Sequence, residues 1–151
     1  MKNKYLKEIF DYKQTREALL QFIQEGFPSE KDEEQLLIHY WHSYNDAFGR
    51  TNTLKPQKRD RQEFRRFMPR LIRIYSKDVV LPDGYEDVAK KYRLDRDFFI
   101  AEIYREMGEF EKSLKILNRI RPFVDEDTTK KINILTMANI RCNPWVIEYP
   151  S

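Results

Sequence analysis

Two histidines and an aspartate are the residues whose types and spacing best suit a metal site. His39 and His42 are three residues apart, and Asp46 follows four residues later, so a helix presents all three on one face. A zinc hydrolase needs a further ligand from elsewhere, and the His-Glu-x-x-His pattern of zinc proteases is missing. A metal-dependent hydrolase is therefore one hypothesis, but we expect no cofactor, with one histidine partly buried and the other in solvent.

The chain holds a single cysteine, Cys142, which excludes an internal disulfide and a cysteine zinc cluster. No pattern of a nucleophilic cysteine surrounds it, and burial is the usual fate of such a residue. A lone thiol is typical of a reducing compartment, and the charged start of the chain lacks the apolar region of a signal peptide. We therefore expect a cytoplasmic protein without a transmembrane segment, and no enzyme.

Positive charge is concentrated in one block. Residues 55–73 contain eight Lys and Arg against two acids, a local charge of +6 in a chain whose net charge is +3. Arginine forks bind phosphate and carboxylate groups, so a nucleic-acid-binding or phosphate-binding module on the helix expected near 55–75 is an alternative hypothesis. It would use Arg59, Arg65, Arg66, Arg70 and Arg73. The competing interpretation is a solvated face, neutralised by acids such as those in residues 30–34.

The elements that position these groups are expected to be helices. Only four glycines occur, and no two lie within twenty residues of each other, which excludes a β-sandwich and a Gly-rich phosphate loop. Apolar periodicity, caps and breakers predict helices over 15–25, 29–49, 56–75, 85–92, 95–107, 109–120 and 125–141, with a shorter amphipathic turn at 5–10. Ser29 and Asp125 are the expected N-caps, and Pro56 suits the first helical position. The helix over 29–49 carries an aromatic stripe that is expected in the core: Tyr40, Trp41, Tyr44 and Phe48.

Two connecting regions are less regular. Pro69 predicts a kink or a break near Phe67 in the helix over 56–75, and residues 76–84 form a connector that could hold a short extended piece. The chain is thus expected to be all-α: a single domain over residues 1–151, built as an antiparallel array of about six to eight helices.

One stretch has the residue pattern of a packed helical hairpin. Its small residues Ala101 and Ser113 allow close helix approach, its aromatic residues Tyr104 and Phe110 fill the gap, and Gly108 supplies the turn. With Leu117 and Ile120, this pattern over residues 97–122 resembles a tetratricopeptide repeat. The rest of the chain shows no clear second copy at a 34-residue period, as a repeat protein would have. The alternative is therefore an ordinary helical hairpin that meets the same packing demands.

The resemblance implies a protein-interaction surface on the first helix of the hairpin at about 95–122. The positions that correspond to it are Asp95, Phe98, Glu102, Arg105 and Glu106; the competing interpretation is a solvated face with Phe98 in the core. After Pro144, the apolar tail of Trp145, Val146, Ile147 and Tyr149 is expected to dock on the body. The leading hypothesis is a non-catalytic interaction or adaptor domain whose partner is another protein, with nucleic acid as the alternative partner.

Overall fold

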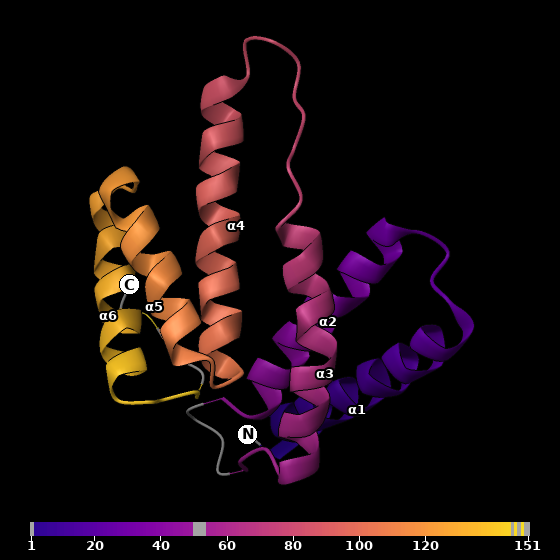
Figure 1. The fold of residues 1–151 in the computed structure, drawn as a ribbon. Coiled ribbons are helices and arrows are strands. Elements are labelled where there is room, and N and C mark those ends of the chain that lie inside the picture. Colours follow the sequence, from indigo (N-terminus) through magenta and orange to yellow (C-terminus); the bar gives the residue numbers. More distant parts are fainter. Residues whose placement is uncertain (1, 50–53, 146, 148, 150–151) are drawn as a thin grey trace. The chain divides into compact units, whose positions relative to one another are not determined.

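All regular secondary structure in the described part of the chain is helical. The structure is a computed structural model that describes residues 2–49, 54–145, 147 and 149, with side chains from Leu6 onward. Its helices are α1 (Lys2–Glu25), α2 (Glu30–Ala47), α3 (Lys58–Tyr75), α4 (Glu86–Glu106), α5 (Phe110–Ile120) and α6 (Glu126–Ile140), with the 3₁₀ helix η1 (Arg121–Phe123) after α5 (Figure 1). Within these residues the expected all-α class, with six α-helices and antiparallel neighbours, is confirmed.

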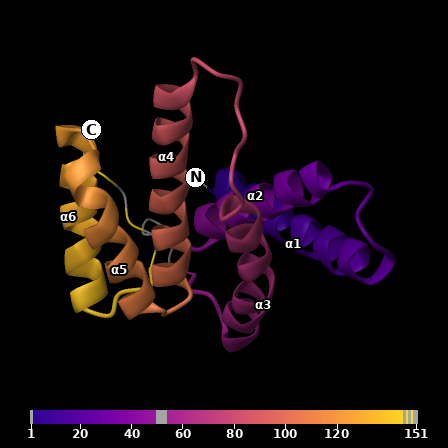
Figure 2. The ribbon, with the colours of Figure 1, turned by 45° about the horizontal axis from the view of Figure 1, so that its top comes forward.

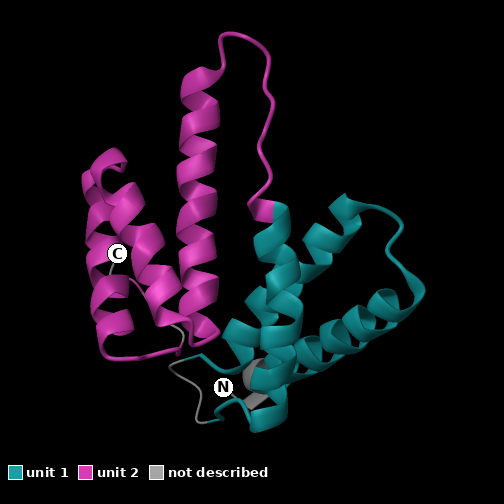
Figure 3. Ribbon diagram, in the orientation of Figure 1, with its two compact units in different colours: residues 1–74, 146–148 teal, residues 75–145, 149–151 magenta. Residues whose placement is uncertain are grey.

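The chain divides into two compact units (Figure 3). Unit 1 consists of residues 1–74 and 146–148, and unit 2 consists of residues 75–145 and 149–151. Unit 1 therefore holds α1, α2 and nearly all of α3, whereas unit 2 holds α4, α5 and α6. The assignment of residues 1–151 to a single domain stays a prediction.

The caps and glycine turns read from the sequence are confirmed. Ser29 Oγ accepts a hydrogen bond from the backbone N–H of Asp32 at 3.1 Å and so caps α2. Asp125 does the same for α6 by accepting from the backbone N–H of Thr128 at 2.7 Å. Gly108 lies in the left-handed region at φ 84° between α4 and α5, where a residue without Cβ carries no steric penalty. Local sequence signals therefore predict these helix ends correctly.

Two expected helix boundaries are wrong. Residues 85–92 and 95–107 were predicted as separate helices, but α4 is continuous from Glu86 to Glu106. The sequence between them contains neither glycine nor proline, and Arg93 bridges the junction with an ion pair to Asp97 at 3.0 Å. Of the kink or break predicted near Phe67, the break is absent, because α3 continues through Pro69.

The structure also answers two questions that the sequence left open, the place of the turn at 5–10 and the conformation of residues 76–84. The turn at 5–10 belongs to α1, and residues 76–84 contain turns and irregular chain but no strand. Helix α3 begins at Lys58, two residues after Pro56, which was expected at the first helical position.

Unit 1 has an aromatic core. Helices α1 and α2 form an antiparallel hairpin, and α3 adds its apolar stripe. Tyr40 packs edge-on against Phe67 with ring centroids 5.2 Å apart, and Tyr44 lies 4.4 Å from Phe64. Trp41 and Phe48 are each 4% exposed. The predicted aromatic stripe of α2 is therefore core, and such edge and offset contacts add to the burial of large apolar surfaces.

Unit 2 combines apolar packing with buried hydrogen bonds. Helices α4, α5 and α6 lie side by side in both views (Figure 1 and Figure 2). Ser113 of α5 donates its hydroxyl to the carbonyl of Ala101 at 2.7 Å, and Asn139 of α6 donates to Ser113 Oγ at 2.9 Å. Ala101 and Ser113 are fully buried, so the small residues allow the close helix approach that the sequence predicted.

Candidate functional site

The C-terminal end of α4 carries an arginine that binds main-chain carbonyls. Arg105 is 1% exposed, and its Nη1 donates to the carbonyls of Asn143 and Trp145, at 2.7 Å each. Asn143 Oδ1 in turn accepts the backbone N–H of Trp145 at 3.0 Å, which folds Asn143, Pro144 and Trp145 into an Asx turn. We call these three residues the C-terminal turn. A buried guanidinium thus holds a short peptide turn by its backbone.

A second polar contact lies one helical turn earlier on α4. Glu102 accepts a hydrogen bond from the hydroxyl of Tyr149. Because Glu102 and Arg105 are three residues apart, they share one helix face. Burial raises the pKa of the Glu102 carboxyl, whereas the bond from Tyr149 and the charges of Arg105 and Lys131 lower it. Burial and the adjacent carboxylate raise the pKa of Tyr149, so its hydroxyl stays protonated and donates.

The five positions expected to line a partner surface have different environments. Asp95 is exposed, but Phe98 is 9% exposed and Arg105 1% exposed. Glu106 has a side chain that is 4% exposed, and its Oε1 lies 3.9 Å from Arg105 Nη2. The interpretation that places Phe98 in the core is confirmed at Phe98, whereas the solvent exposure expected for Arg105 and Glu106 is wrong. The physical reason at Arg105 is that the chain's own C-terminal turn occupies this part of the face; the role of the five residues in partner binding stays a prediction.

The arginines of α3 lie beside acids of unit 1. Arg70 Nε contacts Glu33 Oε1 at 2.7 Å, and Arg73 Nη2 lies 3.8 Å from the same oxygen. Arg65 and Arg66 are exposed, and the Arg66 guanidinium lies 5.9 Å from the ring centroid of Phe67. The expectation that acids of residues 30–34 neutralise this face is confirmed at Glu33. Nucleic-acid binding by this helix stays a prediction.

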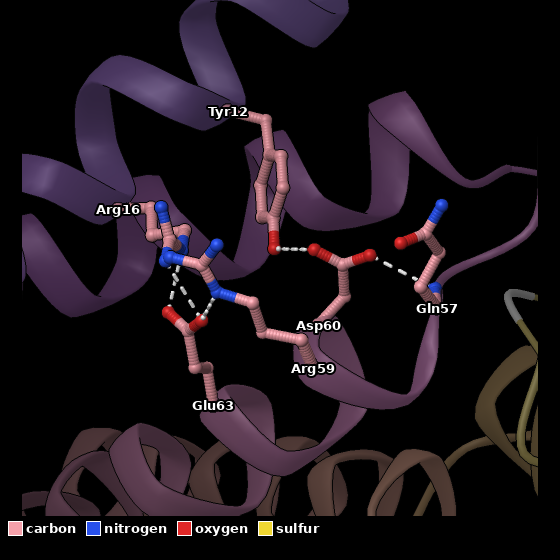
Figure 4. A network of polar contacts seen from close by, with 6 residues as sticks. All are labelled: Tyr12, Arg16, Gln57, Arg59, Asp60 and Glu63. Atoms are coloured by element: carbon pink, nitrogen blue, oxygen red, sulfur yellow. Dashed lines mark hydrogen bonds and ion pairs between the residues drawn. The ribbon is translucent and has the colours of Figure 1, made fainter.

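A polar network joins α1 to the first turns of α3 (Figure 4). Arg16 binds the Glu63 carboxylate with both Nε and Nη2, at 2.5 and 2.9 Å, and Arg59 Nε binds the same carboxylate at 2.9 Å. Tyr12 donates its hydroxyl to Asp60 at 2.9 Å, and Asp60 also accepts the backbone N–H of Gln57 at 2.8 Å. Burial and the contact with Asp60 raise the pKa of Tyr12, so its hydroxyl remains a donor.

The histidines and the cysteine lie in different places from those expected. His39 and His42 are both exposed on α2, because their spacing turns them away from the buried stripe that includes Tyr40. Cys142 is an exposed free thiol in the left-handed conformation at φ 50°. The expected partial burial of one histidine and the expected burial of the cysteine are therefore wrong. Among the described residues, no group of three or more His, Cys, Asp and Glu is arranged to hold a metal ion.

Sequence reasoning missed the partners that complete both polar sites. The docking of the tail was expected and is confirmed for Trp145 and Tyr149 (Val146 lies outside the described residues), but nothing in the sequence assigned Asn143 and Trp145 to Arg105. In unit 1, the spacing of Arg59 and Glu63 is that of a helical ion pair, whereas no local signal connects Arg16 to Glu63.

Every helix in the described part of the chain is too short or too polar to cross a membrane. Compared with protein-family models, with curated proteins and with solved structures, the chain gives no match.

Proposed function

We propose that the chain is a non-catalytic protein-binding module and that the face of α4 around Glu102 and Arg105 receives a peptide segment of the partner. The observation that carries this proposal is the pair of hydrogen bonds from Arg105 Nη1 to the carbonyls of Asn143 and Trp145. Carbonyl oxygens belong to every peptide chain, so another segment that forms the same turn offers the same acceptors.

The two polar contacts recognise different parts of a peptide. Arg105 binds backbone atoms and so selects the shape of a turn, for which an Asn-Pro sequence is well suited. Glu102 accepts from a tyrosine hydroxyl and so selects a side chain. The partner segment that fits both contacts has an Asx turn followed four residues later by tyrosine. The chain's own residues 143–149 have this pattern and compete for the face.

The proposal includes a tetratricopeptide-like character for the hairpin of α4 and α5. The left-handed Gly108 and the bond from Ser113 to the carbonyl of Ala101 support it. Proteins of that repeat family bind peptides on the first helix of each pair, which corresponds to α4 here. We place this binding in the cytoplasm, and the free thiol of Cys142 supports that location.

A peptide-binding experiment on the full chain tests the proposal. The probe is a fluorescein-labelled peptide with the sequence of residues 143–151, and its affinity is measured by fluorescence anisotropy. In the intact chain the tethered segment competes at an effective concentration in the millimolar range. Tyr149→Ala removes the bond to Glu102 and so weakens the competition of the tethered segment, which keeps only its bonds to Arg105, and we expect the labelled peptide to bind about tenfold more tightly than to the intact chain.

Matched variants distinguish specific recognition of the peptide from nonspecific binding. Adding Arg105→Lys to the Tyr149→Ala chain removes the fork that holds both carbonyls and should weaken the labelled peptide at least about tenfold. Adding Arg119→Lys, an exposed arginine of α5, should leave its affinity unchanged. A scrambled peptide that binds Tyr149→Ala as tightly as the native sequence, or equal effects of the two arginine variants, would contradict the proposal.

A further inference from the structure

A cavity in unit 1 carries a different chemistry from the α4 face. It has a volume of about 290 Å³ and is formed by α1, the chain before α3 and the first turns of α3. This volume is near the lower end of the range for small-molecule pockets, and one aromatic ring with a small charged group fits it. The polar network of Figure 4 lies along this cavity.

Several cationic side chains contribute to the lining of the cavity. Lys13, Arg16, Lys55 and Arg59 all line it. Asp60 is the acid among the lining residues, and Glu63 binds Arg16 and Arg59, so the lining itself carries more positive than negative groups. A concave site with an excess of positive charge and low-dielectric walls concentrates anions.

Both carboxylates already have hydrogen-bond donors, and Lys13 and Arg59 are exposed cations of the lining that a ligand can meet. Asp60 accepts from Tyr12 and from the backbone of Gln57, and Glu63 is bound by Arg16 and Arg59. Glu63 also fixes the guanidinium of Arg16, whose side chain is 13% exposed. Arg59 donates to Glu63 from Nε at 2.9 Å, and its side chain is 72% exposed.

Apolar groups form the remaining wall. Ile9, Phe48 and Leu54 line the cavity, and the ring of Tyr12 packs edge-on against Phe48 with centroids 5.1 Å apart. An apolar wall beside fixed cations favours a molecule that has both an apolar body and an anionic group. A free inorganic ion leaves the apolar wall without a contact.

We propose that this cavity binds a small organic anion, a carboxylate or a phosphate ester with an apolar body of about one ring. The ring lies against Ile9, Phe48 and Leu54, and the anionic group meets Lys13 and Arg59. The site is separate from the α4 face and stands on different residues, so either proposal can fail without the other.

Titration calorimetry on the full chain tests this site with four probes: phenyl phosphate, phenylacetate, inorganic phosphate and benzyl alcohol. We expect saturable binding of at least one aromatic anion below about 10 mM, a reasonable limit for a ligand of this size. Inorganic phosphate and benzyl alcohol, which each lack one of the two features, should bind at least about tenfold more weakly. The tighter of the two aromatic anions identifies the anionic group.

Charge-matched variants locate the binding. Arg59→Gln and Lys13→Gln should each weaken the aromatic anion about tenfold, because each removes a charged donor from the lining. Lys58→Gln removes the same charge from the neighbouring exposed residue of α3, which does not line the cavity, and should change the affinity less than twofold. Circular dichroism checks that the variants stay folded.

Three outcomes would overturn the proposal. One is the absence of saturable binding of both aromatic anions. Another is benzyl alcohol binding as tightly as they do, since the cations would then contribute nothing. The third is equal weakening by Lys58→Gln and Arg59→Gln, since that result would report general surface charge rather than this cavity.

Discussion

The two units differ in the contacts that hold their three helices together. In unit 1, aromatic rings from all three helices pack together, and the ion pairs around Glu33 and Glu63 are partly buried. In unit 2, smaller apolar residues are joined by buried hydrogen bonds at Ser113 and Arg105. Apolar packing is nondirectional, whereas hydrogen bonds need defined partners. Under the proposed function, unit 2 is therefore the part in which a single hydrogen-bonding residue would specify a bound peptide.

The largest effect that tests this contrast is the loss of an aromatic ring from unit 1. Phe67 is fully buried against Tyr40. Phe67→Ala should lower the free energy of unfolding by about 3–5 kcal/mol, through lost burial and the remaining cavity. Chemical denaturation followed by circular dichroism measures it. A change below about 1 kcal/mol would mean that the aromatic cluster does not dominate the stability of unit 1.

In unit 2, the corresponding test removes a buried polar group. Arg105→Met keeps much of the side-chain volume but leaves the carbonyls of Asn143 and Trp145 without their donor. The free energy of unfolding should fall by about 2 kcal/mol, which is typical for the loss of hydrogen bonds from a charged group. Hydrogen exchange should also show the C-terminal turn opening while α5 stays protected. Unchanged exchange in the turn would contradict the role assigned to Arg105.

Glu102 gives unit 2 a pH dependence. Burial raises the pKa of its carboxyl in the folded chain above its ordinary value of 4.5. When the pKa of an acid is higher in the folded chain than in the unfolded chain, the folded chain holds the proton more tightly. The stability that this gives is fully present below the unfolded pKa and is lost as the pH rises through the folded pKa. The intact chain should therefore lose stability relative to Glu102→Gln as the pH rises above about 4.5. Parallel stability curves for the two chains would show that the carboxyl is not perturbed.

The smallest effect concerns the end of α6. Cys142 follows the C-cap Arg141 and has a positive φ. Its N–H donates to the carbonyl of Asn139, and the N–H of Asn143 donates to the carbonyl of Ala138. This Schellman arrangement favours glycine. Cys142→Gly should raise the free energy of unfolding by about 0.5–1 kcal/mol by relieving left-handed strain, whereas Cys142→Ser should leave it nearly unchanged. Thermal unfolding compares the two, and a loss of stability with glycine would contradict the strain.

Local signals in the sequence were sufficient for the class of fold and for most helix ends. Ser29 and Asp125 cap the helices that they were expected to cap, and Gly108 turns the chain between α4 and α5. These features depend on neighbouring residues alone. The predicted break near Phe67 and the predicted division between residues 92 and 95 are absent, because α3 and α4 continue through these positions, and in α4 an ion pair joins Arg93 to Asp97.

The candidate site was predictable only in part, since its contacts cross long sequence separations. The resemblance to a helical repeat pointed to Glu102 and Arg105, and the apolar pattern predicted a docked tail. The bond between Arg105 and Asn143 spans 38 residues, and that between Arg16 and Glu63 spans 47. No spacing rule encodes such pairs, so the occupied face of α4 and the cationic cavity of unit 1 emerged from the structure.

The displacement of the C-terminal turn by a peptide tests the central claim most directly. The full chain is labelled with ¹⁵N, and an unlabelled peptide with the sequence of residues 143–151 is added in excess. The indole N–H signal of Trp145 should move toward the position of a solvent-exposed tryptophan, while that of Trp41, buried in unit 1, should stay in place as an internal control. If the Trp145 signal is unchanged at saturating peptide, the α4 face is a site of internal packing and not of peptide binding.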